Sequence, residues 1–167
     1  MKDLDSYLND HLAGSVGELR LIAHCEQLYK GKRLGAFFTK LQTQIVADQN
    51  VLRDLMAHLG IEESKVRQAG AWVGEKLCIA LLAIAGNERN GLGLLLTLEA
   101  LVMGITGKGL LWRALSAADL PNLAMFDFEK LRRRAEEQMK RAQAEQIRSA
   151  RRALLDKRLW RGDSWGS

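Results

Sequence analysis

Residues 92–117 have the sequence LGLLLTLEALVMGITGKGLLWRALSA, and this stretch decides the fold. It contains no proline, and its apolar residues cover nearly the whole circumference of an α-helix. A helix of this kind lies either at the centre of a bundle or in a membrane. Its apolar part, residues 92–105, is shorter than a bilayer span. We therefore predict a soluble helical bundle in which this helix is the central and most buried element.

The rest of the chain also has a helical composition. Its 167 residues include a single proline, Pro121, whereas β-rich folds place prolines in their many turns. Hydrophobic stripes separated by glycines and by Asp119-Leu120-Pro121-Asn122 predict four further helices, over residues 4–29, 34–59, 63–85 and 127–159. We predict one all-α domain over residues 1–160, followed by a disordered tail, residues 161–167.

The positive charge is concentrated in the last predicted helix. Residues 127–158 contain eleven Lys or Arg and six Asp or Glu, an excess that equals the formal net charge of +5 of the whole chain. A solvated helix face accounts for this pattern. Glu136, Glu137 and Glu145 alternate with the positive residues, and no aromatic residues are interleaved for base stacking. We therefore expect weak, salt-sensitive nucleic-acid binding at best.

The cysteines and the first residues bear on the compartment. Cys25 and Cys78 are far apart and flanked by apolar residues, and no Cys-x-x-Cys or Cys/His cluster exists. This pattern excludes a zinc finger and is typical of buried free thiols in a reducing compartment. Met1-Lys2-Asp3-Leu4-Asp5 has charges where a signal peptide needs an apolar core. We expect a cytoplasmic protein with no membrane partner.

Three carboxylates lie at positions predicted to face the bundle interior. Glu18 and Asp48 fall on the apolar stripes of the first two helices, and Glu99 stands alone in the apolar run of residues 92–102. Carboxylates from several facing helices are what a di-iron or di-manganese site in a bundle requires. The other interpretation is that each carboxylate pairs with a buried basic or hydrogen-bonding group, for which Lys108 and Arg113 are candidates.

The segments LNDHLAGS at residues 8–15, LEAL at 98–101, GITGK at 104–108 and LW at 111–112 resemble the ferritin-like superfamily, and in particular its small bacterial members. The resemblance covers about residues 1–158. It implies a four-helix bundle made of the first, second, fourth and fifth helices, with the extra helix, residues 63–85, in the long crossover between the second and third bundle helices.

The resemblance does not extend to the family's metal ligands. Its metal-binding members use a lone Glu on two helices and Glu-x-x-His on the other two. Glu18 and Glu99 match the lone positions, but Asp48 is followed three residues later by Val51. Neither Glu136 nor Glu137 of the last helix is followed by a histidine at that spacing.

These observations lead to three hypotheses for function. The first is a non-catalytic ferritin-like bundle, without a cofactor, that acts by forming a homo-oligomer or by binding a protein partner. The second is an all-carboxylate iron or manganese site made of Glu18, Asp48 and Glu99, and the third is the weak nucleic-acid binding considered above. No enzyme motif is present: residues 104–109, GITGKG, lack the spacing of a phosphate-binding loop.

Overall fold

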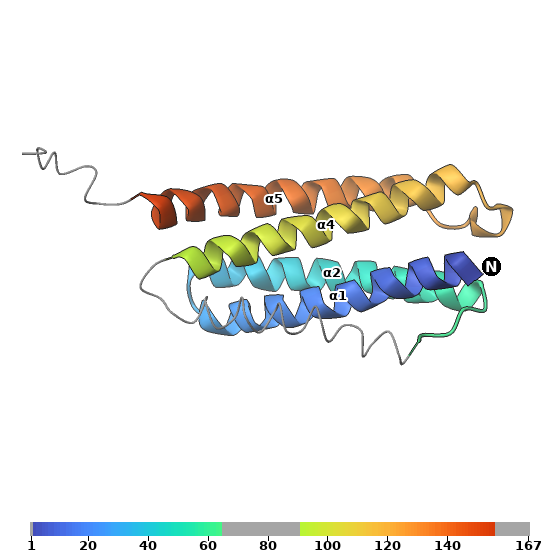
Figure 1. Ribbon diagram of the computed structural model, residues 1–167, viewed down its shortest axis with the longest axis horizontal. Helices are drawn as coiled ribbons and strands as arrows, with labels where there is room; N and C mark the ends of the chain where they lie inside the picture. Colours follow the sequence, from blue (N-terminus) through green and yellow to red (C-terminus); the bar gives the residue numbers. More distant parts are fainter. Residues whose placement is uncertain (1, 65–90, 156–167) are drawn as a thin grey trace, which may run out of the picture.

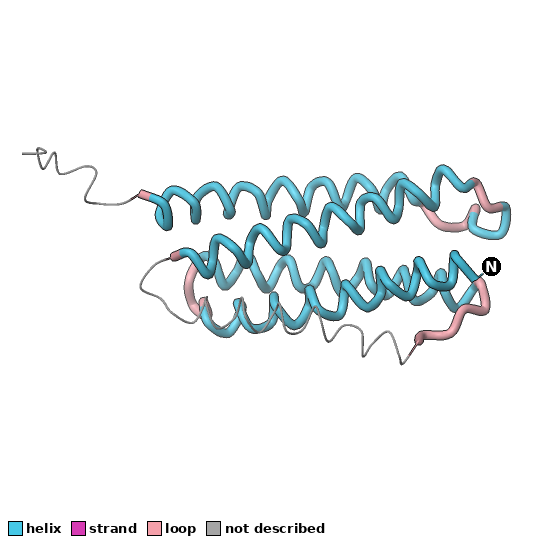
Figure 2. The backbone as a smooth tube through the Cα atoms, in the orientation of Figure 1, coloured by secondary structure: helices cyan, strands magenta, loops and turns pink. Residues whose placement is uncertain are grey.

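The computed structural model describes residues 2–64 and 91–155. These residues form four α-helices and one short 3-10 helix, and they contain no β-strand (Figure 2). The helices are α1 (Lys2–Leu28), α2 (Arg33–His58), α4 (Leu92–Ala118) and α5 (Phe128–Leu154), with η1 (Pro121–Leu123) between α4 and α5. The all-α prediction is confirmed. The helix predicted over residues 63–85 and the tail predicted at residues 161–167 lie outside the described residues, apart from positions 63 and 64.

The four helices form two antiparallel pairs that lie side by side (Figure 1). α1 packs on α2, α4 packs on α5, and α1 also contacts α4. α2 ends at the end of the bundle where α1 begins, and α4 begins at the opposite end (Figure 1). α2 and α4 therefore run in the same direction.

The ends of the helices are set by local chemistry. Gly60 ends α2 with a φ of 67°, and the N–H groups of Gly60 and Ile61 donate to the carbonyls of Ala57 and Met56 at 3.0 and 2.9 Å. A positive φ is the conformation that glycine adopts without a steric cost, and such bonds satisfy the last carbonyls of a helix. Asp127 caps α5, because its side chain accepts a hydrogen bond of 2.8 Å from the backbone N–H of Lys130. Both ends lie within one residue of the boundaries that the sequence predicts, residue 59 for α2 and residue 127 for α5.

The apolar core has two clusters, one towards each end of the bundle. The first includes Leu8, Leu12, Leu52, Leu55, Met56, Leu111, Trp112, Leu115, Leu123, Leu131 and Ala135. The second includes Leu21, Ile22, Cys25, Phe38, Leu41, Ile45, Leu98, Leu101, Ile105 and Ala142. Each of the four helices contributes to both clusters, and between the clusters each helix places polar residues in the interior.

α4 contributes to both clusters, as expected of a central helix, but it is not covered on every side. Met103 and Leu110 on its outer side are 67% and 56% exposed. Nine residues of α4 are buried, the same number as in α2, so the prediction that α4 is the most buried element does not hold among the described helices. By length and composition alone α4 could cross a membrane, a criterion that the core helix of a soluble bundle also meets.

Candidate functional site

A layer of polar side chains separates the two apolar clusters. It is made of Glu18 from α1, Asp48 from α2, Lys108 from α4 and Gln138 from α5, one residue from each helix. Asp48 is 2% exposed and Gln138 is completely buried. Buried polar groups are stable only where they find partners, so the hydrogen bonds of this layer determine what it can do.

Asp48 is the best-compensated group of the layer. The Lys108 ammonium donates to Asp48 Oδ2 at 2.5 Å and to Gln138 Oε1 at 2.6 Å. Gln138 Nε2 donates to the same Asp48 oxygen at 3.0 Å, and the Arg134 guanidinium forms an ion pair with Asp48 Oδ1. The Asp48 carboxylate therefore has two cations and one amide as partners.

Glu18 Oε1 is shielded from solvent and has no hydrogen-bond partner. Asp48 Oδ1 also accepts no hydrogen bond, but it is compensated by its ion pair with Arg134. Burial raises the pKa of Glu18 to about 7; the positive charge of Lys108 opposes this increase, and the negative charge of Asp48 adds to it. The carboxylate lies against Gly104 of α4, where an added Cβ would stand 3.3 Å from Glu18 Cδ and Oε1. The absence of a side chain at Gly104 therefore leaves space for the Glu18 carboxylate.

The Glu18 side of the layer opens into a cleft of about 430 Å³ between α1 and α4. Tyr7 and His11 of α1 line the cleft, with their rings in edge-to-face contact at a centroid distance of 4.7 Å. Burial lowers the pKa of His11, while the negative charge of Asp10 opposes the decrease. Trp112 also lines the cleft, and its indole Nε1 is shielded from solvent without a hydrogen-bond partner.

The predicted carboxylate trio is not brought together. Glu99 is half-buried and accepts a hydrogen bond of 3.2 Å from Gln146 Nε2 of α5, so its partner lies outside the polar layer. Within residues 2–64 and 91–155, no group of three His, Cys, Asp or Glu side chains is placed to hold a metal ion. The Lys108 ammonium lies against Asp48, where a shared metal would need that carboxylate as a ligand. The donor set therefore does not fit the iron or manganese site that the second hypothesis requires.

Of the two basic partners proposed from sequence, Lys108 contacts a carboxylate of the polar layer and Arg113 does not. The pairing of Asp48 with Lys108 is confirmed. Arg113 does not join the layer: it is exposed and lines a groove between α4 and α5.

Sequence reasoning missed Gln138 and Arg134, the two α5 residues that contact Asp48. Gln138 is completely buried although it is polar, whereas the apolar Met139 beside it is only half-buried. The spacing of the sequence could have identified Gln138. The buried residues of α5, polar ones included, recur at alternating three- and four-residue steps: Leu131, Ala135, Gln138, Ala142, Glu145 and Ser149.

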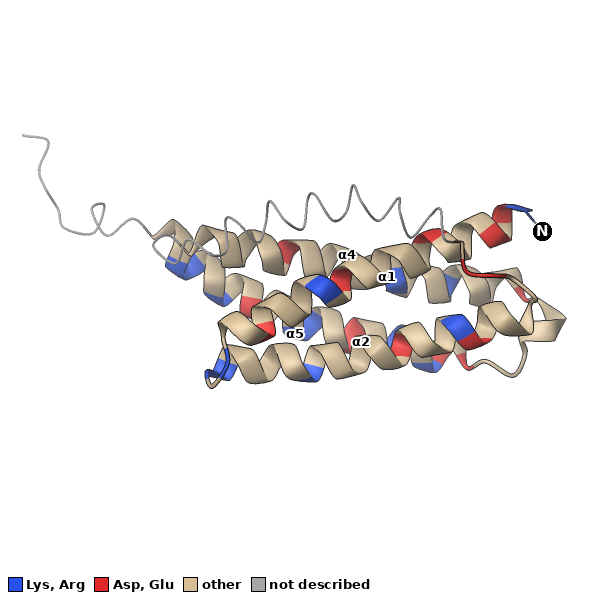
Figure 3. Cartoon of the chain, turned by 90° about the horizontal axis from the view of Figure 1, so that it is seen from below, with Lys and Arg blue, Asp and Glu red and all other residues tan. Residues whose placement is uncertain are grey.

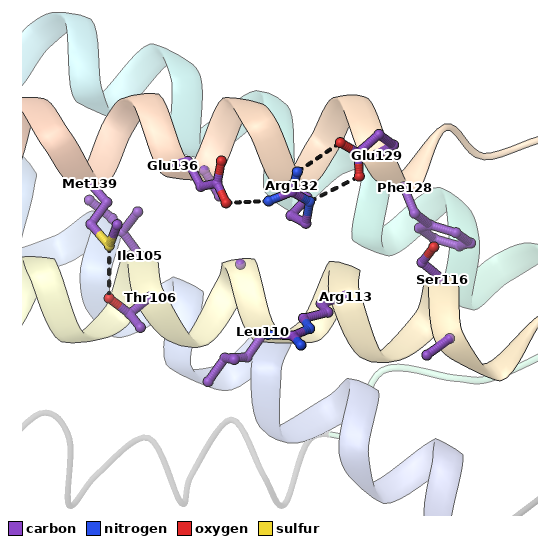
Figure 4. Close-up of a pocket in the computed structure, with 13 residues that line it drawn as sticks. Ile105, Thr106, Leu110, Arg113, Ser116, Phe128, Glu129, Arg132, Glu136 and Met139 are labelled. Carbon is purple, nitrogen blue, oxygen red and sulfur yellow. Dashed lines mark hydrogen bonds and ion pairs between the residues drawn. The ribbon is translucent and has the colours of Figure 1, made fainter.

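The α4–α5 groove has a volume of about 540 Å³ and lies on the outside of the bundle (Figure 4). Its apolar lining comes from both helices and includes Leu110 and Phe128. Along its α5 side, Arg132 bonds Glu129 at 2.9 and 2.7 Å and also pairs with Glu136 (Figure 4). The groove thus combines an apolar floor with charged side chains of both signs.

An ion-pair cluster outside the polar layer joins the N-terminal end of α2 to the C-terminal half of α5. The Arg33 guanidinium donates two bonds, of 2.6 and 2.7 Å, to the buried Glu145 carboxylate, and Arg148 donates a third at 2.6 Å. The Arg33 bonds lower the pKa of Glu145, and burial partly opposes the decrease. Arg148 of α5 is therefore used inside the chain. Positions of both signs are spread over the helices in Figure 3.

The fold and the site together define an all-α bundle whose interior contains a polar layer with its own cations. Comparison with family models, with curated proteins and with solved structures finds no match to this chain. What the protein does must therefore be argued from its own geometry.

Proposed function

We propose that this protein is a non-catalytic, ferritin-like four-helix bundle that acts by associating with a second copy of itself. The topology supports the ferritin-like assignment. α1 with α2 and α4 with α5 are antiparallel pairs, whereas α2 and α4 run in the same direction, which requires a long crossover between them (Figure 1). A bundle with one long crossover is the arrangement of ferritin-like folds.

The outer side of α4 is the single observation that supports self-association. Met103 and Leu110 are largely exposed, and Leu110 also lines the α4–α5 groove. Large apolar side chains grouped beside a groove are typical of protein interfaces.

The charges around the groove favour a second copy over a polyanion. Its charged lining residues are Arg113, Glu129, Arg132 and Glu136, two of each sign. In a two-fold symmetric contact the same patch meets itself, so a patch with equal numbers of positive and negative groups can pair its own charges across the axis. A nucleic acid would instead require a net positive patch.

The polar layer supports a non-catalytic role. Asp48 is held by Lys108, Arg134 and Gln138, so its carboxylate is engaged in structural contacts. The bonds of Asp48 with Lys108, Gln138 and Arg134 favour one register of the helices, since any other register leaves these buried charges unpaired.

The test is the oligomeric state in solution. Sedimentation velocity over a wide range of protein concentrations is expected to show a dimer for the parent protein and a monomer for Leu110→Glu. The matched control is Met125→Glu, because Met125 is 72% exposed and does not line the groove. A parent that is monomeric throughout, or equal dissociation by both variants, would overturn the proposal.

The two other functions are tested separately. Elemental analysis of protein purified without chelator is expected to show no stoichiometric iron, manganese or zinc. About one metal ion per chain, lost in both Glu18→Ala and Glu99→Ala, would establish the all-carboxylate site instead.

Nucleic-acid binding is expected to be weak because two of the three consecutive arginines of α5 have partners within the chain. Arg132 pairs with Glu129 and Glu136, and Arg134 pairs with Asp48. Tight duplex DNA binding at physiological salt, abolished when Arg132, Arg133 and Arg134 are changed to Ala, would favour the nucleic-acid function.

A further inference from the structure

We propose that the cleft between α1 and α4 binds a small organic molecule with a primary ammonium group. The ammonium contacts the carboxylate of Glu18, and the apolar body of the molecule lies among the aromatic and aliphatic residues of the lining. This site is separate from the α4–α5 groove, and its occupancy does not depend on self-association.

The unsatisfied carboxylate of Glu18 is the first observation. Glu18 lines the cleft, and its Oε1 is shielded from solvent and accepts no hydrogen bond. Nearly all buried polar atoms in proteins have a partner, and an atom without one marks a place where a ligand or a water molecule supplies it. The missing partner of a carboxylate oxygen is a hydrogen-bond donor.

The charge of the cleft selects a cationic donor. Three lining residues are acidic, Asp10, Glu18 and Asp48, and Lys108 is the one Lys or Arg among the lining residues that the structure describes. Arg134 and Lys108 both contact Asp48, and neither forms a hydrogen bond to Glu18 Oε1. A positive ligand group would therefore gain a charge-assisted bond to Glu18.

The chain itself shows that an ammonium group suits this layer. Lys108 Nζ lies 2.5 Å from Asp48 Oδ2 and 2.6 Å from Gln138 Oε1, in the layer to which Glu18 belongs. An ammonium group is compact and donates in three directions, so it fits among oxygen acceptors on different helices.

The remaining lining suits the body of an amine. The rings of Tyr7, His11 and Trp112 line the cleft together with Leu52 and Leu111. Aromatic faces attract cations, and the combination of rings with a carboxylate is typical of protonated-amine sites. The volume of about 430 Å³ lies within the usual range for small-molecule pockets.

Two glycines keep the cleft open. Gly14 of α1 and Gly107 of α4 both line it, and an added Cβ at either position would meet nothing within 4 Å.

The experiment titrates the full-length protein with primary alkylammonium ions from propyl to hexyl, at pH 8, by isothermal calorimetry and heteronuclear NMR. The alcohols of the same chain lengths are the neutral controls. The ammonium ions are expected to bind at least about tenfold more tightly than the alcohols, which is the range of a hydrogen bond to a charged group. Equal binding of alcohols and ammonium ions, or no binding of the ions, would overturn the proposal.

Two pairs of variants locate the binding site. Glu18→Gln is expected to remove the preference for ammonium ions, whereas Glu99→Gln is expected to keep it, because Glu99 does not line the cleft. Gly104→Ala places a methyl group 3.3 Å from the Glu18 carboxylate and should also weaken binding. Gly17→Ala is its control, since a Cβ there meets nothing within 4 Å and Gly17 lies outside the cleft. Circular dichroism checks that each variant is folded, and unchanged ammonium binding by folded Glu18→Gln would refute the assignment.

The pH dependence gives an independent readout. The pKa of Glu18 is about 7, so its carboxylate is mostly protonated at pH 6 and mostly ionised at pH 8. Affinity for the ammonium ions is therefore expected to rise about tenfold between these values. Burial lowers the pKa of His11, which also lines the cleft, and this moves its protonation towards lower pH. An affinity that does not change with pH would contradict the contact with Glu18.

Discussion

Replacing Lys108 by Met tests whether the polar layer is held together by its internal cation. Methionine has a similar length and no charge, so the substitution removes the ammonium group without opening a large cavity. It leaves Gln138 Oε1 without its donor and leaves Asp48 with Arg134 and Gln138 as its partners. The charge of Asp48 stays buried, since this residue is only 2% exposed.

The magnitude follows from these contacts. Removing one partner of a buried ion pair costs about 3–5 kcal/mol, because the other charge stays buried. Arg134 still pairs with Asp48 Oδ1, so the loss is expected at the lower end of that range, about 3 kcal/mol. For a chain of this size such a loss lowers the melting temperature by about 6–12 °C.

The assay is urea unfolding of the parent and of Lys108→Met, followed by far-UV circular dichroism. A second substitution, Asp48→Asn, provides the control within the layer. An Asn at position 48 removes the buried charge, and its amide can exchange two hydrogen bonds with the amide of Gln138. The double variant is therefore expected to recover at least half of the stability lost in Lys108→Met.

Two results would refute this reasoning. One is a loss below about 1 kcal/mol in Lys108→Met, which would mean that Asp48 does not depend on the ammonium. The other is a double variant no more stable than the single one, which would mean that the loss came from packing and not from an uncompensated charge.

Three further predictions concern stability. The pKa of Glu18 is raised from 4.5 to about 7, so between these pH values the folded protein keeps a proton that the unfolded chain releases. The free energy of unfolding therefore decreases by up to about 3 kcal/mol as the pH rises from below 4.5 to above 7. Urea unfolding at pH 5 and pH 8 should show that Glu18→Gln lacks this decrease and is the more stable protein at pH 8; the same pH dependence in both proteins would contradict it. Leu101→Ala removes a side chain from the second apolar cluster and should cost about 2–5 kcal/mol in the same assay, and a cost below about half a kcal/mol would show that the site is not core. Glu145→Gln should cost about 1 kcal/mol at pH 7, a small value because its partner Arg33 is largely exposed. The pKa of Glu145 is lowered in the folded protein, so the difference in unfolding free energy between parent and variant should disappear as the pH falls through that lowered pKa. A difference that persists in acid would exclude the ion pair as its source.

The helices and their ends could be predicted because the signals are local. The sequence predicts a helix over residues 34–59, which is observed as Arg33–His58, and a helix over residues 92–117, which is observed as Leu92–Ala118. The apolar period, the positive-φ glycine at position 60 and the cap at Asp127 each act within a few residues of chain. The positions of Glu18 and Asp48 near the bundle interior followed from the same period.

Side-chain pairing between helices could be predicted only in part. Lys108 was one of two candidate partners of the carboxylates, and it contacts Asp48, whereas the other candidate, Arg113, lies in the outer groove. Both are on α4, five positions apart in sequence. A rotation of that helix about its axis decides which of them faces Asp48, and this rotation is set by the packing of all the helices together.

The sequence by itself therefore determined the all-α class, the boundaries of α1, α2 and α4 to within two residues, and the placement of Glu18 and Asp48 on inward stripes. The tertiary structure alone decided that Glu99 pairs with Gln146 outside the polar layer and that Gln138 and Arg134 complete the contacts of Asp48. It also decided that Glu18, which lines a cleft, keeps an oxygen without a hydrogen-bond partner. The physical reason is the range of the interactions. A helix is defined by contacts three or four residues apart, whereas a partner for a buried carboxylate comes from another helix, and its identity depends on the axial shift and rotation at which the apolar clusters pack best.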